Sequence, residues 1–444
     1  MDKKLLINLF DELFPIMRSI SGPGIEESMN IFKNHMPGMK IHKTPSKTKV
    51  FDWEVPLEWH FNRGKLIGPN GELVCDSKIS NLHVLNYSIP VDKKLTLKEL
   101  DKHLYSLPNL PDAIPYVTSY YKKNWGFCLS HNKRKSLKSG IYHAKIDSKF
   151  IDGGVPFAEL TLKGESKKEI LLSSYLCHPS LANNELSGPL VLLGLFMKIK
   201  NWKKRRFSYK FLLNPETIGS ICFLHKYKDE VKDKIIGGLV LTCLGGPSQS
   251  LNYKMSRNSN SIINKVISSQ NDNFLTKIHQ HPFTATGGSD ERQFCSPGFN
   301  LPIGQISRTT YANYEGYHNS MDNKDFLNFD NLIQSIEVIE QILKYAEVCG
   351  YPVNQSPFGE VQLGKRGLYP NINSSENMSS SNDEVKDGRV SLNRRLIILN
   401  MADGKNSLID IAKQCNCSID DLIPTIEFLE SKGLIKYNTE IKRL

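Results

Sequence analysis

The sequence predicts an α/β fold whose central sheet is buried on both faces, and three observations support this. Residues Ile170 to Leu176 form a short apolar run without polar alternation, which is typical of a strand in a covered parallel sheet. A polar turn follows, and Ser187 then opens a second apolar run, Pro189 to Met197, which indicates a helix with proline in its first turn. The alternation of strand and helix continues along the chain. Because ligands bind outside the carboxyl ends of strands in such sheets, His178, just after the first strand, is a candidate site residue.

The N-terminal residues predict two helices, and a region of short strands follows them. Leu6 to Met17 places apolar residues on one helical face, and Ile25 to His35 follows as a second helix. Acidic residues interrupt the first run, which excludes a signal peptide. From residue 44 to 154, short apolar runs alternate with glycine and proline. We interpret this as a β-rich module inserted into an α/β domain made of residues 1–43 and 155–350.

The inserted module is rich in aromatic residues. We interpret Trp53 and Trp59 as parts of a local core. The segment PYVTSYYKKNWGFC carries Tyr120, Tyr121 and Trp125, which fit either a local core or the wall of a cleft. The sequence leaves these two interpretations open.

Further polar groups follow later strands of the predicted sheet. Ser208 to Leu213 is expected to be a strand that leads to Glu216, and Leu301 to Ser307 a strand that leads to His318. A loop between them carries Asp290. Singly, such residues are usually solvated or structural, and a glutamate after a strand often only complements a helix dipole. Together, two histidines and a carboxylate suit zinc, and a further carboxylate can deprotonate a water activated by the metal.

The C-terminal part is expected to form a separate unit. Residues 351–389 are rich in Pro, Gly, Ser and Asn and are interpreted as a linker, and residues 390–444 as a winged-helix-like domain. Ser407 and Ser418 are expected to cap its second and third helices. The third helix is acidic, which argues against nucleic acid as a partner and favours protein contact or homo-oligomerisation.

Composition narrows the class of protein further. The net charge is +11, from 57 Lys and Arg against 46 Asp and Glu, but the basic residues are dispersed, as on an ordinary solvated surface. Nine scattered cysteines indicate reduced thiols and a cytoplasmic protein. No stretch approaches the roughly 20 apolar residues of a membrane span.

Four motifs carry a resemblance to a known group of proteins. In order, CHPSLANNELSG, NPETIGS, GGSDERQF and YHNSMDN resemble the zinc aminopeptidase clan that includes leucine aminopeptidases and glutaminyl cyclases. With WEVPLEW and FGEVQLGKRGLYP, the chain looks more closely like a bacterial aminopeptidase-like family, often encoded near polysaccharide-biosynthesis genes. The resemblance implies a doubly wound mixed sheet, an inserted β-rich module and a C-terminal winged helix.

The resemblance also implies roles for individual residues. His178 and His318 stand at the first and last zinc-binding histidines. Glu216 stands at the general base and Asp290 at an aspartate close to the site, so we expect these two as the catalytic carboxylates. Three ligand positions depart from the clan's pattern, and there the chain has Asn184, Thr217 and Gly246. A site for two zinc ions is therefore not expected.

One departure has two interpretations. Glu185 follows Asn184 directly, so His178, Glu185 and His318 would hold a single zinc ion. Alternatively, Glu185 only complements the N-terminus of the following helix.

Two functions follow from this pattern. The first is a zinc-dependent hydrolase that cleaves a peptide-like or acyl amide bond in a small substrate, in connection with polysaccharide biosynthesis. The alternative is a catalytically silent aminopeptidase-like binding or assembly protein. The lost ligand positions favour the second function, and the retained His178, Glu216, Asp290 and His318 favour the first.

Overall fold

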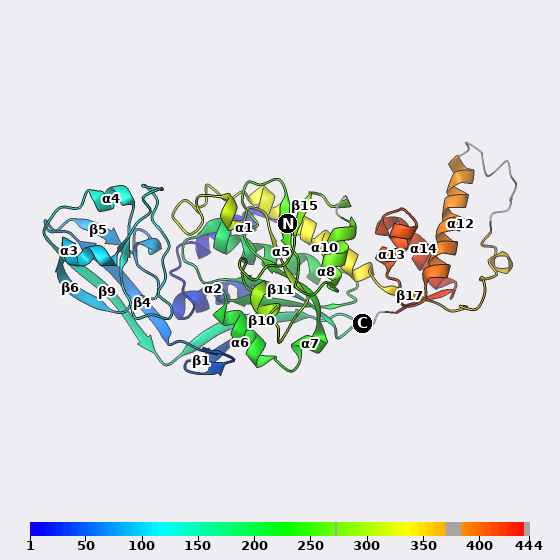
Figure 1. Cartoon of the computed structure of the whole chain (residues 1–444), viewed down its shortest axis with the longest axis horizontal. Helices are drawn as coiled ribbons and strands as arrows, with labels where there is room; N and C mark the ends of the chain where they lie inside the picture. Colours follow the sequence, from blue (N-terminus) through cyan, green and yellow to red (C-terminus); the bar gives the residue numbers. More distant parts are fainter. Residues whose placement is uncertain (271–272, 370–382, 439–444) are drawn as a thin grey trace. The chain divides into compact units, whose positions relative to one another are not determined.

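The computed structural model describes residues 1–270, 273–369 and 383–438. The chain forms two compact units, which are described separately below. The first comprises Met1–Ser261 and Leu275–Glu340, and the second comprises Ile262–Phe274 and Gln341–Leu444. Figure 1 labels their helices and strands.

A mixed sheet forms the centre of the first unit. Within the described residues it has eight strands, in the spatial order β1 (Lys40–Pro45), β10 (Gly154–Leu162), β12 (Ser208–Asn214), β11 (Glu169–Tyr175), β13 (Ile235–Leu241), β16 (Ile303–Ser307), β14 (Leu251–Lys254) and β15 (Ile278–His281). The four middle strands β12, β11, β13 and β16 run parallel, and β10 and β14 flank them in the antiparallel direction. Every residue of β11 is buried, Ser173 and Ser174 included, which explains why the strand shows no alternation of apolar and polar residues. The predicted α/β class with a mixed sheet is confirmed.

The order of the middle strands creates a crevice. The chain passes from β11 to β12 on one side and then crosses to β13 on the other side of β11. Strand order therefore reverses at β11, and a crevice forms outside the carboxyl ends of the strands at such a point. His178 and Glu216 follow β11 and β12 at this end of the sheet.

Helices cover the sheet. Those of the first unit are α1 (Lys3–Leu13), α2 (Pro23–His35), α5 (Ser187–Lys200), α6 (Ile218–Lys226), α7 (Val231–Lys234), α9 (Glu291–Phe294) and the first part of α10 (Phe329–Val348). In α5, Gly188 permits close approach to β13, because a Cβ atom there would lie 2.3 Å from the carbonyl oxygen of Leu241. Helix α1 ends at Leu13, earlier than the predicted Met17, because Pro15 has no N–H to continue the hydrogen-bond ladder.

The β-rich module is inserted between two paired strands of the large sheet. The chain leaves at Pro45 and returns at Gly154, and these two residues pair in the β1–β10 register. The module has a four-stranded antiparallel sheet, in the order β5 (Leu73–Asp76), β4 (Glu58–Ile67), β9 (Ile141–Ile151) and β6 (Val91–Thr96). Short elements complete it: β2 (Lys49–Val50), β3 (Trp53–Glu54), β7 (Leu104–Tyr105), β8 (Phe127–Cys128), α3 (Leu97–Leu100) and α4 (His131–Lys135).

The aromatic residues of the module divide between two environments. Trp125 belongs to the module's buried core, which settles the question left open for it, and Trp59 is also buried. Trp53 is 37% exposed, so its interpretation as core was wrong. It lies on the short hairpin β2–β3, whose two-residue strands leave little core to enter.

The second unit contains the winged-helix fold that the sequence predicts. The helices of this fold are α12 (Asp383–Met401), α13 (Leu408–Gln414) and α14 (Ile419–Ser431), and its strands are β17 (Tyr351–Asn354) and β18 (Ile435–Asn438). The unit also includes α8 (Ile262–Gln270) and the last part of α10. The predicted N-caps are confirmed, because Ser407 and Ser418 each form a capping box with an aspartate three residues later.

The linker expected over residues 351–389 needs a correction. Strand β17 lies at its start and pairs antiparallel with β18 near the other end of the unit, so Tyr351–Asn354 is part of the winged helix. A polar-looking YPVN segment does not reveal such a pairing, since its partner lies more than 80 residues away. The middle of the expected linker, residues 370–382, lies outside the described residues. In the described part of the chain, no helix has the length and apolar character needed to cross a membrane.

Candidate active site

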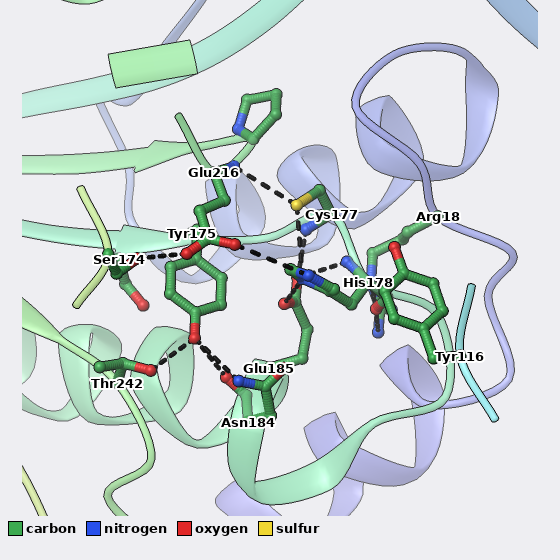
Figure 2. A network of polar contacts seen from close by, with 12 residues as sticks. Arg18, Tyr116, Ser174, Tyr175, Cys177, His178, Asn184, Glu185, Glu216 and Thr242 are labelled. Atoms are coloured by element: carbon green, nitrogen blue, oxygen red, sulfur yellow. Dashed lines mark hydrogen bonds and ion pairs between the residues drawn. The ribbon is translucent and has the colours of Figure 1, made fainter. Parts of the chain in front are cut away.

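His178 is the centre of the candidate site. It follows β11, is almost fully buried, and its imidazole lies between two carboxylates (Figure 2). Nδ1 lies 2.5 Å from Oε2 of Glu185, and Nε2 lies 3.7 Å from Oε2 of Glu216. The two ring nitrogens therefore have different partners, and Nε2 is the one directed toward Glu216.

Glu185 reaches His178 from a distorted helical turn. Ala182–Leu186 forms one π-helical turn before α5, and such turns are frequent at functional sites. Oε1 of Glu185 accepts hydrogen bonds from the backbone N–H groups of Cys177 and His178, the latter at 2.9 Å. Both carboxylate oxygens are thus engaged with the His178 segment.

This geometry differs from both interpretations of Glu185. A carboxylate bonded to Nδ1 cannot share a metal with Nε2 of the same ring, since the two nitrogens point in divergent directions. The contact instead places a proton on Nδ1 and directs Nε2 toward Glu216, as outer carboxylates do for metal-binding histidines. Glu185 therefore lies where a positioning residue for His178 would lie, and its expected role as a metal ligand stays a prediction.

Glu216 lies at the end of β12, where Pro215 precedes it. Its Oε1 accepts a hydrogen bond from the Ser289 hydroxyl at 2.6 Å, which leaves Oε2 facing His178. Burial raises the pKa of Glu216, although the positive charge of His178 opposes this. A carboxylate with a raised pKa is a stronger proton acceptor.

Asp290 holds the backbone next to Glu216. It is fully buried and accepts hydrogen bonds from the side chains of Asn214 and Ser220, at 2.8 and 3.0 Å, and from the backbone N–H of Thr217 at 2.6 Å. Thr217 has φ 64°, an uncommon conformation for a β-branched residue, and the bond from its N–H to Asp290 holds it there. Burial, with the neighbouring Glu216, raises the pKa of Asp290 to about 7. These donors enclose the carboxylate, which therefore holds the backbone beside Glu216, and the expected catalytic role of Asp290 stays a prediction.

His318 completes the group from a loop beyond β16. Its ring centroid lies 5.3 Å from that of His178, and Tyr116 lies edge-on to both rings. Burial and the charge of His178 lower the pKa of His318 to about 3, so its imidazole is neutral at pH 7. Among the described residues, neither of its ring nitrogens has a hydrogen-bond partner. Its φ of 56° is a second uncommon backbone conformation at the site.

The charge on His178 depends on its neighbours. Burial lowers the pKa of His178, but Cys177 and Glu185 together outweigh burial and raise it well above the usual range. We give the larger weight to Glu185, because burial raises the pKa of the Cys177 thiol to about 11 and the thiol is neutral at pH 7. A metal ion at Nε2 would displace a proton there, so metal binding would release protons.

Two residues of the site were not singled out by the sequence. Arg18 is fully buried, and its guanidinium donates two hydrogen bonds to the carbonyl oxygen of His178, at 2.9 and 3.2 Å. Tyr116 packs on both histidines, and its N–H donates to the carbonyl oxygen of His318 at 2.8 Å. No sequence pattern indicates that Arg18 belongs to the site. Tyr116 lies in the aromatic segment PYVTSYYKKNWGFC, and the high aromatic content of this segment could have indicated a site residue.

Asp322 is a third residue that sequence reasoning left unassigned. Its carboxylate accepts hydrogen bonds from the backbone N–H groups of Asn183 and Asn184, at 2.7 and 2.9 Å, and so satisfies the open start of the π-helical turn. Burial raises its pKa to about 6. The motif YHNSMDN contains both His318 and Asp322, so one short loop supplies a site histidine and the anchor of the Glu185 turn.

The departures from the clan's ligand pattern are visible in the structure. Gly246 has no space for a ligand side chain, because a Cβ atom there would lie 2.4 Å from Cβ of Thr309. The amide of Asn184 donates to the Tyr175 hydroxyl at 3.1 Å, and no described residue donates a hydrogen bond to its buried Oδ1. A neutral amide cannot bridge two cations as a carboxylate does, so the side chains do not fit a two-zinc centre.

A single zinc ion fits the remaining groups better. Around a tetrahedral zinc with Zn–N bonds of about 2.0–2.1 Å, two ligand atoms lie roughly 3.3 Å apart and two imidazole centroids roughly 5 Å apart. The His178 and His318 centroids, at 5.3 Å, match this geometry. Oε2 of Glu216, at 3.7 Å from Nε2 of His178, lies beside the same position. Cys177, His178 and Glu185 also cluster, but the 2.5 Å contact within that cluster is a hydrogen-bond distance and too short for two ligands of one ion. A metal ion held by the described residues would therefore lie on the Nε2 side of His178.

The strand order, the crevice at β11 and the two histidines with Glu216 define an aminopeptidase-like α/β protein. The chain belongs to the family described as domain of unknown function DUF4910, whose model matches residues 7–348. A winged helix-turn-helix model matches residues 351–437.

Relatives support the same class. One protein of Clostridium acetobutylicum is 42% identical over 410 residues, which cover 92% of this chain and 90% of that protein; it is named, provisionally, for polysaccharide biosynthesis and an aminopeptidase-like domain. A crystal structure from the same organism, provisionally called a peptidase, has a TM-score of 0.86 at 38% identity and covers 98% of this chain and 96% of that one. A zinc aminopeptidase from Bacillus subtilis has a TM-score of 0.57 at 11% identity, with 78% of this chain and 94% of that chain covered, and shows similarity of fold alone.

Proposed function

We propose that this protein is a hydrolase that uses one zinc ion to cleave an acyl amide bond in a substrate of polysaccharide biosynthesis. The convergence of His178, His318 and Glu216 at the β11 crevice carries the proposal. The name of the Clostridium acetobutylicum relative suggests the biosynthetic setting. His178 Nε2 and His318 would hold the metal, which when bound would act as a Lewis acid toward the amide carbonyl and make an attacking water more acidic.

The side chains supply the proton chemistry. Oε2 of Glu216 accepts the proton of the attacking water, while the Ser289 hydroxyl holds Oε1 in place. The carboxyl group then returns the proton to the nitrogen of the departing amine. Trp53, Tyr120 and Tyr121 line the cavity of about 190 Å³ beside Glu216 and limit the entry of bulk water.

A second function is supported by a specific observation. Gly246 is closed by Thr309 and offers no ligand, so the site has fewer metal-binding groups than an ordinary two-zinc aminopeptidase. A binding or assembly protein that performs no chemistry would be consistent with this loss. It would not need Glu216 to be held beside His178.

Metal analysis separates the two functions. We expect the full-length protein, loaded with zinc and then dialysed, to retain one zinc ion per chain by elemental analysis. Two ions per chain would contradict the single-metal site. Retention of none, together with no cleavage across a panel of acyl amides, would favour the binding protein.

Replacing Glu185 with glutamine tests its positioning role. The amide N–H group would donate to Nδ1 of His178 and shift the ring proton to Nε2, so the metal would lose its ligand atom. We expect zinc affinity to fall by roughly 10–100-fold, the effect typical of lost outer-shell partners. Competition with a chromogenic chelator would measure the change. Glu165→Gln, on an exposed loop of the same unit, is the matched control and should bind zinc as the wild type does. Unchanged affinity in Glu185→Gln would refute the positioning role.

A further inference from the structure

Two adjoining cavities lie at the candidate site, and His178 and Glu216 line one of them. The smaller, of about 190 Å³, is lined by His178 and Glu216 together with Trp53, Tyr120 and Tyr121. The larger, of about 730 Å³, shares Tyr120 and Tyr121 as a wall and extends into the inserted module. Ligand pockets usually measure about 300–1,000 Å³, so only the larger of these two has room for most of a small substrate. The reacting bond and the body of the substrate would thus occupy different cavities.

Aromatic rings form much of the larger cavity. Tyr87 lies edge-on to Phe150, with centroids 4.9 Å apart, and edge-on to Tyr120 at 5.9 Å. The hydroxyl groups of Tyr87 and Tyr120 are already used, in contacts with the Leu57 carbonyl oxygen and the Tyr116 hydroxyl. These side chains therefore present mainly ring faces and edges. Tyr121 is 55% exposed and is available to cover a ligand.

Charged groups lie beside the rings. Lys122 and Lys123 line the cavity, both are exposed, and within the described part of the chain neither ammonium group has an ion-pair or hydrogen-bond partner. Glu54 is the carboxylate in the lining, so two positive charges face one negative charge. The cavity therefore favours a ligand that carries a negative charge. It does not complement the free ammonium group of an ordinary aminopeptidase substrate.

We propose that the larger cavity binds an anionic N-acylated amino sugar, such as a sugar phosphate, and presents its amide to Glu216 and the two histidines. A pyranose ring has one face of C–H groups that packs on aromatic rings, and its phosphate matches the lysine pair. The assignment rests on the proposed function, whose substrate class it names. Tyr120 and Tyr121 are the specificity-determining residues, because they lie between the sugar and the reacting bond.

Calorimetric titration of the full-length Glu216→Gln protein tests the assignment without turnover. The probes are N-acetylglucosamine 1-phosphate, UDP-N-acetylglucosamine, neutral N-acetylglucosamine and leucinamide. We expect both anionic sugars to bind roughly tenfold or more tightly than the neutral sugar, as two exposed ion pairs allow. The double change Lys122→Gln and Lys123→Gln should remove this difference and leave binding of the neutral sugar unaltered. Lys203→Gln with Lys204→Gln, another exposed adjacent pair, is the matched control and should leave all affinities unchanged.

A separate substitution tests the aromatic residues of the larger cavity. Tyr121→Ala should weaken all three sugars by about tenfold, since the stacking contact is lost whatever the charge of the ligand. Preferential binding of leucinamide, or sugar binding that neither Tyr121 nor the lysine pair affects, would overturn the assignment. Because titration needs no catalysis, anionic sugars that bind but are never cleaved by the wild type would refute the hydrolase and leave the sugar site standing. Cleavage of other amides without sugar binding would refute the sugar site alone.

Discussion

Glu216→Gln is expected to lower the rate of amide hydrolysis by roughly 100-fold or more, the scale that general acid–base groups contribute. Glutamine keeps the shape of the side chain and can still accept the hydrogen bond from Ser289 at Oε1, so the protein should fold as before. It cannot accept a proton at the position that faces His178, which is why catalysis should fail. Turnover of a cleavable acyl amide and zinc content, measured on the same preparation, give the two necessary readouts.

The control for Glu216→Gln is Glu315→Gln, an exposed glutamate in the loop that carries His318. It changes charge near the site without touching the proposed proton acceptor, and its activity should equal that of the wild type. Full activity in Glu216→Gln would dismiss Glu216 as the base. Loss of zinc from that variant would instead make Glu216 a metal ligand, a role that its 3.7 Å distance from His178 Nε2 also permits.

Substitution of either histidine is expected to abolish zinc retention. His318→Asn is the cleaner test, because asparagine tolerates the left-handed backbone that His318 adopts at φ 56° and the ring makes no hydrogen bond among the described residues. We expect a folded protein with less than a tenth of the wild-type zinc after dialysis, since a single histidine binds zinc weakly. His178→Ala should lose zinc equally and should also be less stable, because it leaves the buried Glu185 carboxylate without its imidazole partner.

Elemental analysis and thermal denaturation measured together distinguish these effects. His279→Asn, at an exposed position on β15, controls for the loss of a surface histidine and should keep its zinc. If His318→Asn retains full zinc, His318 is not a ligand and the matching ring geometry is only packing. If His178→Ala alone retains zinc, the metal lies elsewhere than on the Nε2 side of His178.

Much of the fold could be predicted because burial leaves a direct trace in the sequence. The apolar run Ile170 to Leu176 and the turn to Ser187 match β11 and α5, and the serine caps of α13 and α14 are confirmed. Predictions failed where the outcome depends on a distant partner. β17 is a strand only because β18 pairs with it, and Trp53 is exposed on a hairpin whose strands are two residues long.

In the candidate site, the positions of some residues could be predicted from the sequence, but their roles could not. His178 and Glu216 could be placed together from the sequence, because each directly follows a strand whose carboxyl end meets the same edge of the sheet. Glu185 and Asp290 could be expected nearby, but their roles could not, since these depend on which atoms each carboxylate faces. The carboxylate of Glu185 contacts Nδ1 of His178, and the carboxylate of Asp290 accepts a hydrogen bond from the backbone N–H of Thr217.

The sequence by itself determined which elements form and which polar groups reach the crevice, because hydrophobic pattern and strand ends are local properties of the chain. Only the tertiary structure decided what those groups do. It placed Glu185 against Nδ1 of His178 and brought Arg18 and Tyr116 to the histidines from distant segments. It also filled the space beside Gly246 with Thr309. The physical reason is that hydrogen-bond direction and steric closure are set by atoms far apart in sequence, and no spacing of residues records them.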